Sequence, residues 1–261
     1  KTDDLIKNIS GEIGPIKIKE GDLKLKLSSD ISIEANFISN IKYNNKITNY
    51  KNLIKNIQYA KNIVSLEADL NNSILINLDK TYKVKKYEYK NNGKIEKINF
   101  DFEKSLKNDF LGKKVEQLHL TESEIKTNFN SKNNTTFFSG KYSLNGGNSL
   151  LFNIDNMIEG NSLKLKLDAE YDEPIDIELI NYKKPKKNIV NFSMNLEKQK
   201  DNVKIKKISL IEGNNLISAE DMRFNKDNLL SFKNILVKTT KKGKKNNDFS
   251  ISYKKKISIK G

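Results

Sequence analysis

The chain holds few side chains that could carry out catalysis. Its only histidine is His119, and it has no cysteine among 261 residues. A catalytic histidine usually acts together with a second histidine, a nucleophile or a metal ligand, and thiolate chemistry needs cysteine. His119 lies between Leu118 and Leu120 in the segment QLHLTES, so on a two-faced strand it takes the polar face. We predict a surface histidine and a protein that is not an enzyme.

The acidic residues gather once, without the spacing of an ion-binding loop. The cluster surrounds Pro174 and consists of Asp168, Glu170, Asp172, Glu173 and Asp176. Carboxylates alone would favour calcium, but the sequence has no D-x-D-x-D-G loop. It also lacks the patterns G-x-x-x-x-G-K-[ST], G-x-S-x-G and G-x-G-x-x-G. We therefore expect a solvated strand edge here, with no metal and no cofactor.

The positive charge does not point to a specific nucleic-acid partner. The net charge of +15 comes from 48 lysines and arginines against 33 acidic residues. Arg223 is the only arginine, although arginine is the residue best suited to phosphate and base contacts. The lysines are spread along the chain, as on a solvated face. Attraction to an anionic lipid surface needs only point charges and stays open.

The informative feature is a strict alternation of apolar and polar residues. From Leu23 to Phe37 the odd positions are apolar, with Ser29 as the exception at a predicted bend. Successive side chains point to opposite faces of a strand, so this pattern predicts one apolar face and one charged face. Similar segments recur, giving roughly fifteen short strands. Turn signals are Asn71-Asn72, Asn91–Gly93, Asn145–Gly147, Gly160-Asn161, Gly213-Asn214, Lys226–Asn228 and Gly243.

The predicted fold is mainly β: a long antiparallel, curved open sheet of repeated hairpins with one or two short helices. Apolar residues at helical spacing place one helix over 48–62, and a shorter one is expected within 101–114. We treat residues 1–261 as a single segment of a longer protein, with a weak candidate boundary at 183–188. Hydrophobic residues make up 36% and charged residues 31%, which is little apolar surface to cover such a sheet twice. From the residues alone, an open groove and a closed sandwich or barrel core remain equal alternatives.

The last third resembles the C-terminal repeats of AsmA-like envelope proteins, especially the YhdP-type branch of alphaproteobacteria. The similarity covers residues 180–239. It rests on Tyr182, Lys184 and Pro185, on a strand–turn–strand unit, and on the stretch from Gly213 to Ala219. The aromatic residue is tyrosine where tryptophan is expected, and asparagine replaces many turn glycines. The resemblance implies a periplasmic segment of the Gram-negative cell envelope, anchored in the inner membrane through a part outside this chain.

What the resemblance implies for function is bridge-like lipid transfer. A β-groove would carry phospholipid between inner and outer membrane, and the chain would be a monomer continued by further repeats. Two alternatives stay open: a structural sandwich or solenoid spacer, and a lysine-rich electrostatic binder of anionic lipid or polysaccharide. The predicted residues contacting phospholipid acyl chains are the parity-matched apolar ones: Leu23, Leu25, Leu27, Ile31, Ile33, Phe37, Val64, Leu66, Leu70, Ile74, Ile76, Leu78, Leu163, Leu165, Leu167, Ile175, Ile177, Leu179, Phe192, Met194, Leu196, Ile208 and Leu210.

Overall fold

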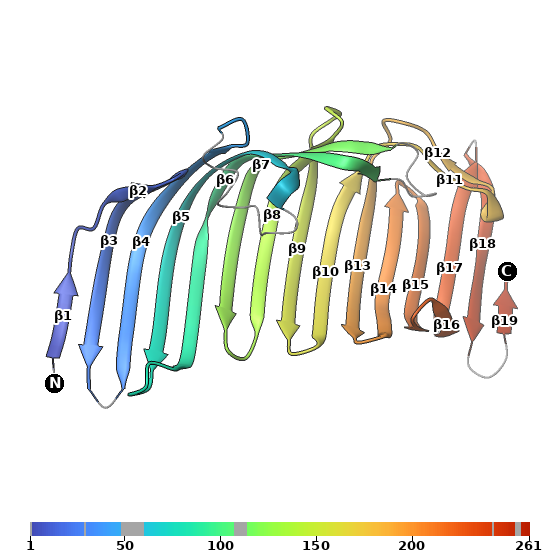
Figure 1. The fold of residues 1–261 in the computed structure, drawn as a ribbon. Helices are drawn as coiled ribbons and strands as arrows, with labels where there is room; N and C mark the ends of the chain where they lie inside the picture. Colours follow the sequence, from blue (N-terminus) through green and yellow to red (C-terminus); the bar gives the residue numbers. More distant parts are fainter. Residues whose placement is uncertain (1, 29, 48–59, 107–113, 242, 254–256) are drawn as a thin grey trace. The chain divides into compact units, whose positions relative to one another are not determined.

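The computed structural model describes residues 2–28, 30–47, 60–106, 114–241, 243–253 and 257–261, and these are almost entirely strand (Figure 1). Within those ranges no helix is long and apolar enough to cross a membrane. The elements are β1 (Thr2–Ile6), β2 (Gly11–Ile13), β3 (Ile16–Leu27), β4 (Ile31–Asn44), the 3-10 turn η1 (Ala60–Asn62), β5 (Ile63–Leu78), β6 (Val84–Leu106), β7 (Val115–Asn130), β8 (Asn134–Leu144), β9 (Leu150–Glu159), β10 (Ser162–Tyr171), β11 (Ile175–Ile177), the 3-10 turn η2 (Glu178–Ile180), β12 (Tyr182–Lys184), β13 (Val190–Gln199), β14 (Asn202–Glu212), β15 (Asn215–Asn225), β16 (Asn228–Ser231), β17 (Asn234–Lys241), β18 (Lys244–Tyr253) and β19 (Ile257–Lys260).

Seventeen of these strands belong to one antiparallel sheet that is not closed into a barrel, while β11 and β12 form a small sheet of their own. The predicted fold class is thereby confirmed. By its internal contacts the chain divides into unit 1 (residues 1–104 and 116–147) and unit 2 (residues 105–115 and 148–261). The candidate boundary at 183–188 lies inside unit 2. That the chain is one segment of a longer protein stays a prediction.

Unit 1 is an up-and-down meander whose register aligns the apolar residues of successive strands. β3 pairs with β4, β4 with β5, and β5 with β6, all antiparallel. Both β1 and β2 pair with the other edge of β3, so they act as one interrupted edge strand. Directly paired residues share a face of the sheet. One such row across β3 to β6 is Leu25, Ile33, Ile76 and Tyr87, and the next is Leu23, Ala35, Ile74 and Tyr89.

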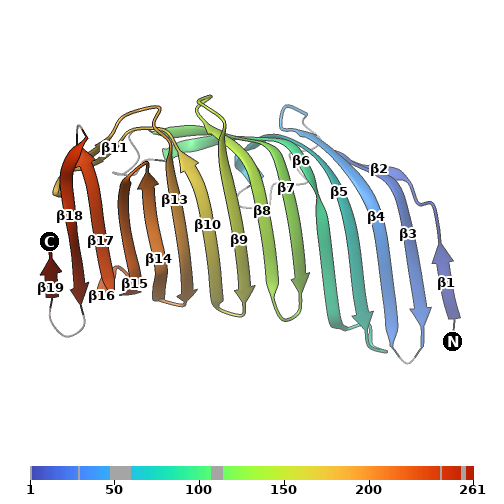
Figure 2. The same cartoon turned by 180° about the vertical axis from the view of Figure 1, so that it is seen from behind.

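Unit 2 repeats this construction. β9, β10, β13, β14 and β15 pair in sequence, and β15 is followed by β17 and β18 (Figure 2). Rows of directly paired residues are again apolar throughout. The longest runs Ile154, Leu167, Met194, Ile208, Ala219, Ile235 and Ile251, and beside it lie Phe152, Ala169, Phe192, Leu210, Ile217, Val237 and Phe249. We call the side that carries these rows in each unit the apolar face, and the opposite side the polar face.

Two consecutive polar residues occur where the apolar face of a strand changes from odd-numbered to even-numbered residues, or the reverse. In β14, Val203 and Ile205 are odd-numbered members of the apolar face, whereas Ile208 and Leu210 are even-numbered. The register shifts at this point, and the pair Lys206-Lys207 accommodates the extra residue as a β-bulge. The pairs Lys19-Glu20, Lys85-Lys86 and Glu96-Lys97 lie at equivalent shifts in β3 and β6. Each bulge returns the following apolar residues to the same face.

Most of the predicted turns are confirmed, but two are wrong. Turns occur at residues 145–147, 160–161, 213–214, 226–227 and 243. The predicted bend at Ser29 lies outside the described residues, and its neighbours Ser28 and Asp30 are bends. The predicted turns at Asn71-Asn72 and Asn91–Gly93 instead lie inside the uninterrupted strands β5 and β6. Asn72 pairs with Asn91, and Asn71 with Asn92, so the amides find partners across the sheet. Parity is unchanged through both sites, which a continuous strand explains.

The helix predictions are only partly open to comparison. Residues 48–59 and 107–113 lie outside the described ranges, and η1 covers the last residues of the first predicted helix. Of the segment 101–114, within which a shorter helix was expected, residues 101–106 continue β6, so this helix stays a prediction for the part outside the described ranges. The alternating apolar residues Ile175, Ile177 and Leu179 do not form one strand, because β11 stops at Ile177 and η2 follows.

Close strand approach at Gly93 gives a test of the register. A Cβ on Gly93 would overlap the backbone oxygen of Asp69 and lie 2.9 Å from the Cα of Leu70. We expect Gly93→Ala to lower the free energy of unfolding by about 2 kcal/mol or more. Gly11→Ala is the control, since nothing lies within 4 Å of its Cβ position, and it should change stability by less than about 0.5 kcal/mol. Equal urea midpoints for both variants would contradict the register of β5 and β6.

Candidate functional site

The apolar face of each unit is neither buried nor fully exposed. Among the predicted lining residues that belong to the main sheet, all are half-buried except Leu27, which is 40% exposed. Neighbours along the strand and across the ladder shield the flanks of each side chain, and its tip stays open to solvent. In a two-layered core these residues would be almost fully buried. Their partial exposure therefore favours an open apolar surface over a closed core.

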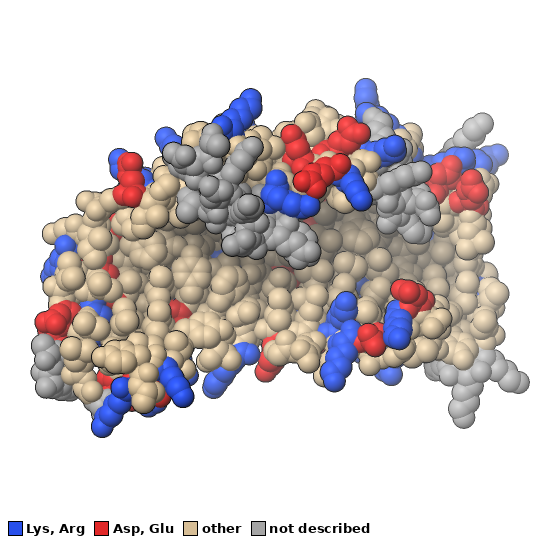
Figure 3. All heavy atoms as spheres, viewed as in Figure 1, with Lys and Arg blue, Asp and Glu red and all other residues tan. Residues whose placement is uncertain are grey.

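The accessible area supports the same conclusion. The chain exposes 17,430 Å², whereas a globular protein of 30.0 kDa exposes about 11,700 Å². Only thirteen hydrophobic residues of the described ranges are buried. A largely single-layered sheet with two accessible faces accounts for the excess, because the described residues leave most of both faces in contact with water. Figure 3 shows the apolar face of each unit as a hollowed, largely uncharged surface.

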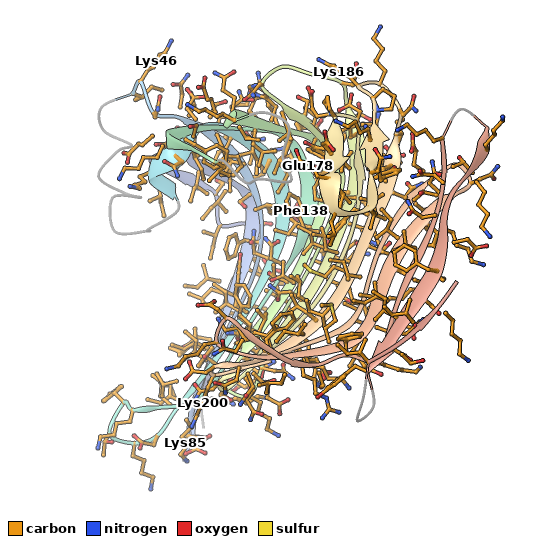
Figure 4. The ribbon with its side chains drawn as sticks, turned by 90° about the vertical axis from the view of Figure 1, so that its right-hand side faces the viewer. Lys46, Lys85, Phe138, Glu178, Lys186 and Lys200 are labelled. Carbon is orange, nitrogen blue, oxygen red and sulfur yellow. The ribbon has the colours of Figure 1, made fainter. Side chains whose placement is uncertain are left out.

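Charged side chains lie at the borders of this hollowed surface in each unit. In unit 1, Figure 4 places Lys46 at one rim and Lys85 at the other, with Phe138 between them. Phe138 is paired with Ile125 on β7. Phe129 is four residues further along β7 than Ile125, so it lies on the same face. Phe129 lies against Tyr89, with 6.2 Å between the ring centroids, which joins β7 and β8 to the apolar face of β6. In unit 2 the rims are marked by Lys186 and Lys200.

A buried polar network interrupts the apolar face of unit 1. The side-chain amide of Asn72 donates to Ser39 Oγ at 2.9 Å, and its oxygen accepts from the Tyr89 hydroxyl at 2.9 Å and from Asn91 at 3.0 Å. Asn72, Asn91 and Ser39 are all buried. Since the members satisfy one another, the network offers no open donor that would demand a polar ligand. It divides the apolar face into two regions.

In unit 2, one end of the apolar face is covered by residues 172–188, which we call the strap. Its β11, η2 and β12 place Ile175 and Tyr182 against Val190 of the sheet, with Leu210 and Ile217 packed beside them. The three predicted lining residues of this segment therefore do not belong to the main sheet. Ile175 is buried between the strap and the sheet, and Ile177 packs against the cluster that Ile175 forms with Tyr182 and Val190. Leu179, on η2, is 95% exposed.

Glu212 fastens the strap to the sheet. It accepts hydrogen bonds from the Tyr182 hydroxyl at 2.7 Å, from Asn188 Nδ2 at 2.6 Å and from Asn215 Nδ2 at 3.0 Å. Burial alone would raise the pKa of Glu212, but these three hydrogen bonds outweigh it and hold the pKa below its ordinary value. Burial, together with the bond to Glu212, raises the pKa of Tyr182. Asn247 adds a bond of 2.7 Å to the carbonyl of Ile180.

Lys184 is the other polar anchor of the strap. It is 1% exposed, and its Nζ donates to the carbonyls of Glu173 at 2.8 Å and Pro185 at 3.2 Å. The ring of Tyr171 lies 5.8 Å from this nitrogen. Burial lowers the pKa of Lys184, because it disfavours the charged form. The tyrosine, lysine and proline that carry the family resemblance are thus structural residues of the strap.

The remaining candidate groups have structural partners. His119 lies on the polar face, as predicted, with Nδ1 2.7 Å from Oδ1 of Asn99. The acidic cluster is dispersed: Asp172 accepts from Asn148 at 2.5 Å, Glu170 from the Leu151 amide at 2.9 Å, and Asp176 pairs with Lys183 at 2.6 Å. In the part of the chain that the structure describes, no group of three or more potential ligands could hold a metal ion.

Several members of the apolar face were not predicted from the sequence. The most central are Tyr89, Phe138, Ile205, Ile217, Val237 and Phe249. Counting parity again after each doubled polar pair would have found Ile205, because Lys206-Lys207 separates it from Ile208. Val64, which was predicted, lies at a register shift between Ile63 and Ser65. The strap has a strand-like alternation at Ile175, Ile177 and Leu179, but nothing in that pattern predicts that the segment folds over the sheet.

No protein-family model matches this chain, and neither the curated proteins nor the solved structures contain a significant match.

The openness of the apolar face predicts tolerance to charge. Leu165→Lys places an ammonium group on a half-buried position, where the side chain can reach water, so we expect a loss of about 1 kcal/mol or less in unfolding free energy. Val190→Lys buries the same group at a position that is 1% exposed, and should cost about 3 kcal/mol or more. Urea denaturation of both variants checks this. Comparable large losses would mean that the face is covered.

The strap contact predicts a pH-dependent stability. At pH 7, Glu212→Gln should cost about 1–3 kcal/mol, since it weakens hydrogen bonds to a charged acceptor. A lowered pKa stabilises the folded state above the ordinary glutamate value of about 4.3, and this contribution is lost as pH falls through the folded-state pKa. The difference between wild type and variant should therefore narrow below about pH 4. Glu159→Gln, at the exposed end of β9, is the matched control for replacing a glutamate by glutamine away from the strap.

Proposed function

We propose that this chain is a non-catalytic lipid-carrying segment, in which the apolar face of each unit binds the acyl chains of phospholipids. The observation that carries the proposal is the row of half-buried apolar side chains on a hollowed sheet face. Within the described ranges, no second protein layer covers this row outside the end of unit 2 that residues 172–188 cover. Exposed apolar patches of this extent mark interaction surfaces. A soluble protein that leaves such a surface open requires a partner that gains by covering it.

The energetics of such binding match the need for a carrier. Each methylene kept from water contributes about 0.8 kcal/mol of transfer free energy. Moving a two-chain lipid with about 30 methylenes into water without a carrier would therefore cost about 24 kcal/mol. Contact with leucine, isoleucine and phenylalanine side chains removes most of that penalty. Because apolar contact is non-directional, the lipid can move along a face without breaking specific bonds.

The polar face supports solubility, and part of its positive charge is paired with carboxylates. Its lysines form cross-strand ion pairs such as Lys206 with Glu197 at 2.6 Å, Lys19 with Asp69 at 2.8 Å, and Lys26 with Glu34 at 3.3 Å. Pairs as exposed as these contribute little to stability. They do neutralise many lysines, which weakens the case for an electrostatic binder that uses this face.

The cellular setting of the proposal follows from the resemblance to AsmA-like envelope proteins. In that setting the chain lies in the periplasm of a Gram-negative cell, anchored in the inner membrane through a part outside this chain. Phospholipid would move between the inner and outer membranes. The half-buried apolar face in each unit is compatible with this role, and the fold alone would equally suit a spacer whose apolar face is covered by another chain.

Photo-crosslinking in cells separates these functions. A photoreactive amino acid is placed on the apolar face at Leu25, Leu66 or Leu165, and adducts are analysed by mass spectrometry. We expect lipid adducts at all three sites, because each side chain points to the surface that would hold acyl chains.

The matched controls are the preceding or following residues on the polar face, Lys24, Glu67 and Lys166, which should give no lipid adducts. Protein adducts at the apolar positions, with lipid at none of them, would instead support the structural spacer. Equal lipid labelling on both faces would show that the reaction reports only proximity to a membrane.

A further inference from the structure

A lysine occupies an apolar-face position at the rim of unit 2. Along β13 the apolar face takes Phe192, Met194 and Leu196, and the next position of the same parity is Lys198. Lys198 is paired with Leu163 on β10 and with Val203 on β14, so its Cβ points to the same side as theirs. The alternation that supplies an apolar residue elsewhere in the strand thus ends in a cation.

This lysine borders a hollow with an apolar floor. The hollow, of about 470 Å³, is lined by Ile158, Leu163, Lys198, Lys200 and the turn residues 160–162. Ile158 is 41% exposed and Leu163 is half-buried, so the floor is open to an apolar ligand. Two ammonium groups and no carboxylate belong to its lining.

The position of Lys200 is fixed by the hairpin. Gln199 pairs with Asn202, which leaves Lys200 and Asp201 as a two-residue turn, and Lys200 has a left-handed backbone with φ of 52°. The carbonyl of Asp201 accepts from the amide of Lys226 in the neighbouring hairpin at 2.8 Å. Figure 4 shows Lys200 at the end of the sheet opposite Lys186. The turn therefore holds this cation at the border between the apolar face and solvent.

The acidic neighbours are directed elsewhere or lie outside the hollow. Glu197 is on the polar face, paired with Lys206 at 2.6 Å. Glu159 pairs with Ser162 in the β9–β10 ladder and has the parity opposite to Ile158. Asp201 is the closest acidic residue in sequence and is not part of the lining. In the described ranges no ion pair joins Lys198 or Lys200 to a carboxylate.

From this arrangement we infer that the rim of unit 2 at Lys198 and Lys200 binds the phosphate of an anionic phospholipid whose acyl chains lie on the apolar face. The inference rests on the proposed function and deepens it by naming the lipid class. Two ammonium groups at the end of an apolar surface match an amphiphile with a net negative headgroup, and they match a zwitterionic one less well, because its own cation repels them.

The test uses the full chain and two defined lipids, phosphatidylglycerol and phosphatidylcholine with identical acyl chains, offered as an equimolar mixture. Lipids bound to the purified protein are counted by native mass spectrometry. We expect the wild type to prefer phosphatidylglycerol about tenfold, and Lys198→Glu with Lys200→Glu to remove the preference while total bound lipid changes less than about twofold. Lys198→Gln with Lys200→Gln should give the same direction with a smaller change.

The matched control is Lys164→Glu with Lys166→Glu, which changes the net charge equally but lies on the polar face of β10. An equal loss of preference in this control, or no preference in the wild type, would overturn the headgroup site while lipid binding stands. Binding of neither lipid by the wild type would instead overturn the proposed function. Glycerol phosphate, which has no acyl chains, should not displace the bound lipid; displacement at micromolar concentration would point to a free-phosphate site and contradict the inference.

Discussion

The sheet is held together by its main-chain hydrogen-bond ladders more than by a core. In most β domains a second layer buries one face of the sheet, and that burial dominates stability. In the described part of this chain the buried hydrophobic residues are few, and the main apolar rows remain half-exposed. Most strands are therefore held chiefly by their neighbours, through antiparallel registers of which that of β4 with β5 is among the longest. Side chains on one face add stability by shielding one another laterally.

Several of the well-buried residues lie where something other than the plain meander is present. Val190 lies beneath the strap, Tyr182 is part of the strap, and Asn72 and Asn91 belong to the polar network. The strap also shifts ionisable groups: burial lowers the pKa of Lys184, whereas at Glu212 hydrogen bonds outweigh burial and hold the pKa below its ordinary value. The two units thus interrupt their apolar faces differently. Unit 1 does so with amides on the strands themselves, and unit 2 with a folded insertion between β10 and β13.

Period-two alternation was enough to predict the all-β fold and the apolar side of most strands, but it left an open sheet and a closed core as equal alternatives. The pattern is predictive for a physical reason. Because the polar face of the sheet is in water, its residues must be polar, and they alternate strictly with the apolar residues of the other face. The errors arose where a local signal competed with a long-range partner. Asn71-Asn72 has the composition of a hairpin turn, yet its amides bond across β4 and β6, which a local pattern does not report. The strap was missed because its contacts join residues about 30 to 65 positions apart, as with Tyr182 to Glu212 and Asn246 to Asn181.

The doubled polar residues have a consequence for how such a chain can change during evolution. One inserted codon in a regular strand would move every later side chain to the wrong side, and selection would remove it. At Lys85-Lys86, Glu96-Lys97 and Lys206-Lys207 the extra residue is instead accommodated as a bulge between two hydrated side chains. Strand lengths can therefore drift by single residues, and apolar residues can be exchanged for one another, while the oily surface persists. A protein built in this way can keep its fold after its amino-acid sequence has diverged beyond recognition from that of its homologues.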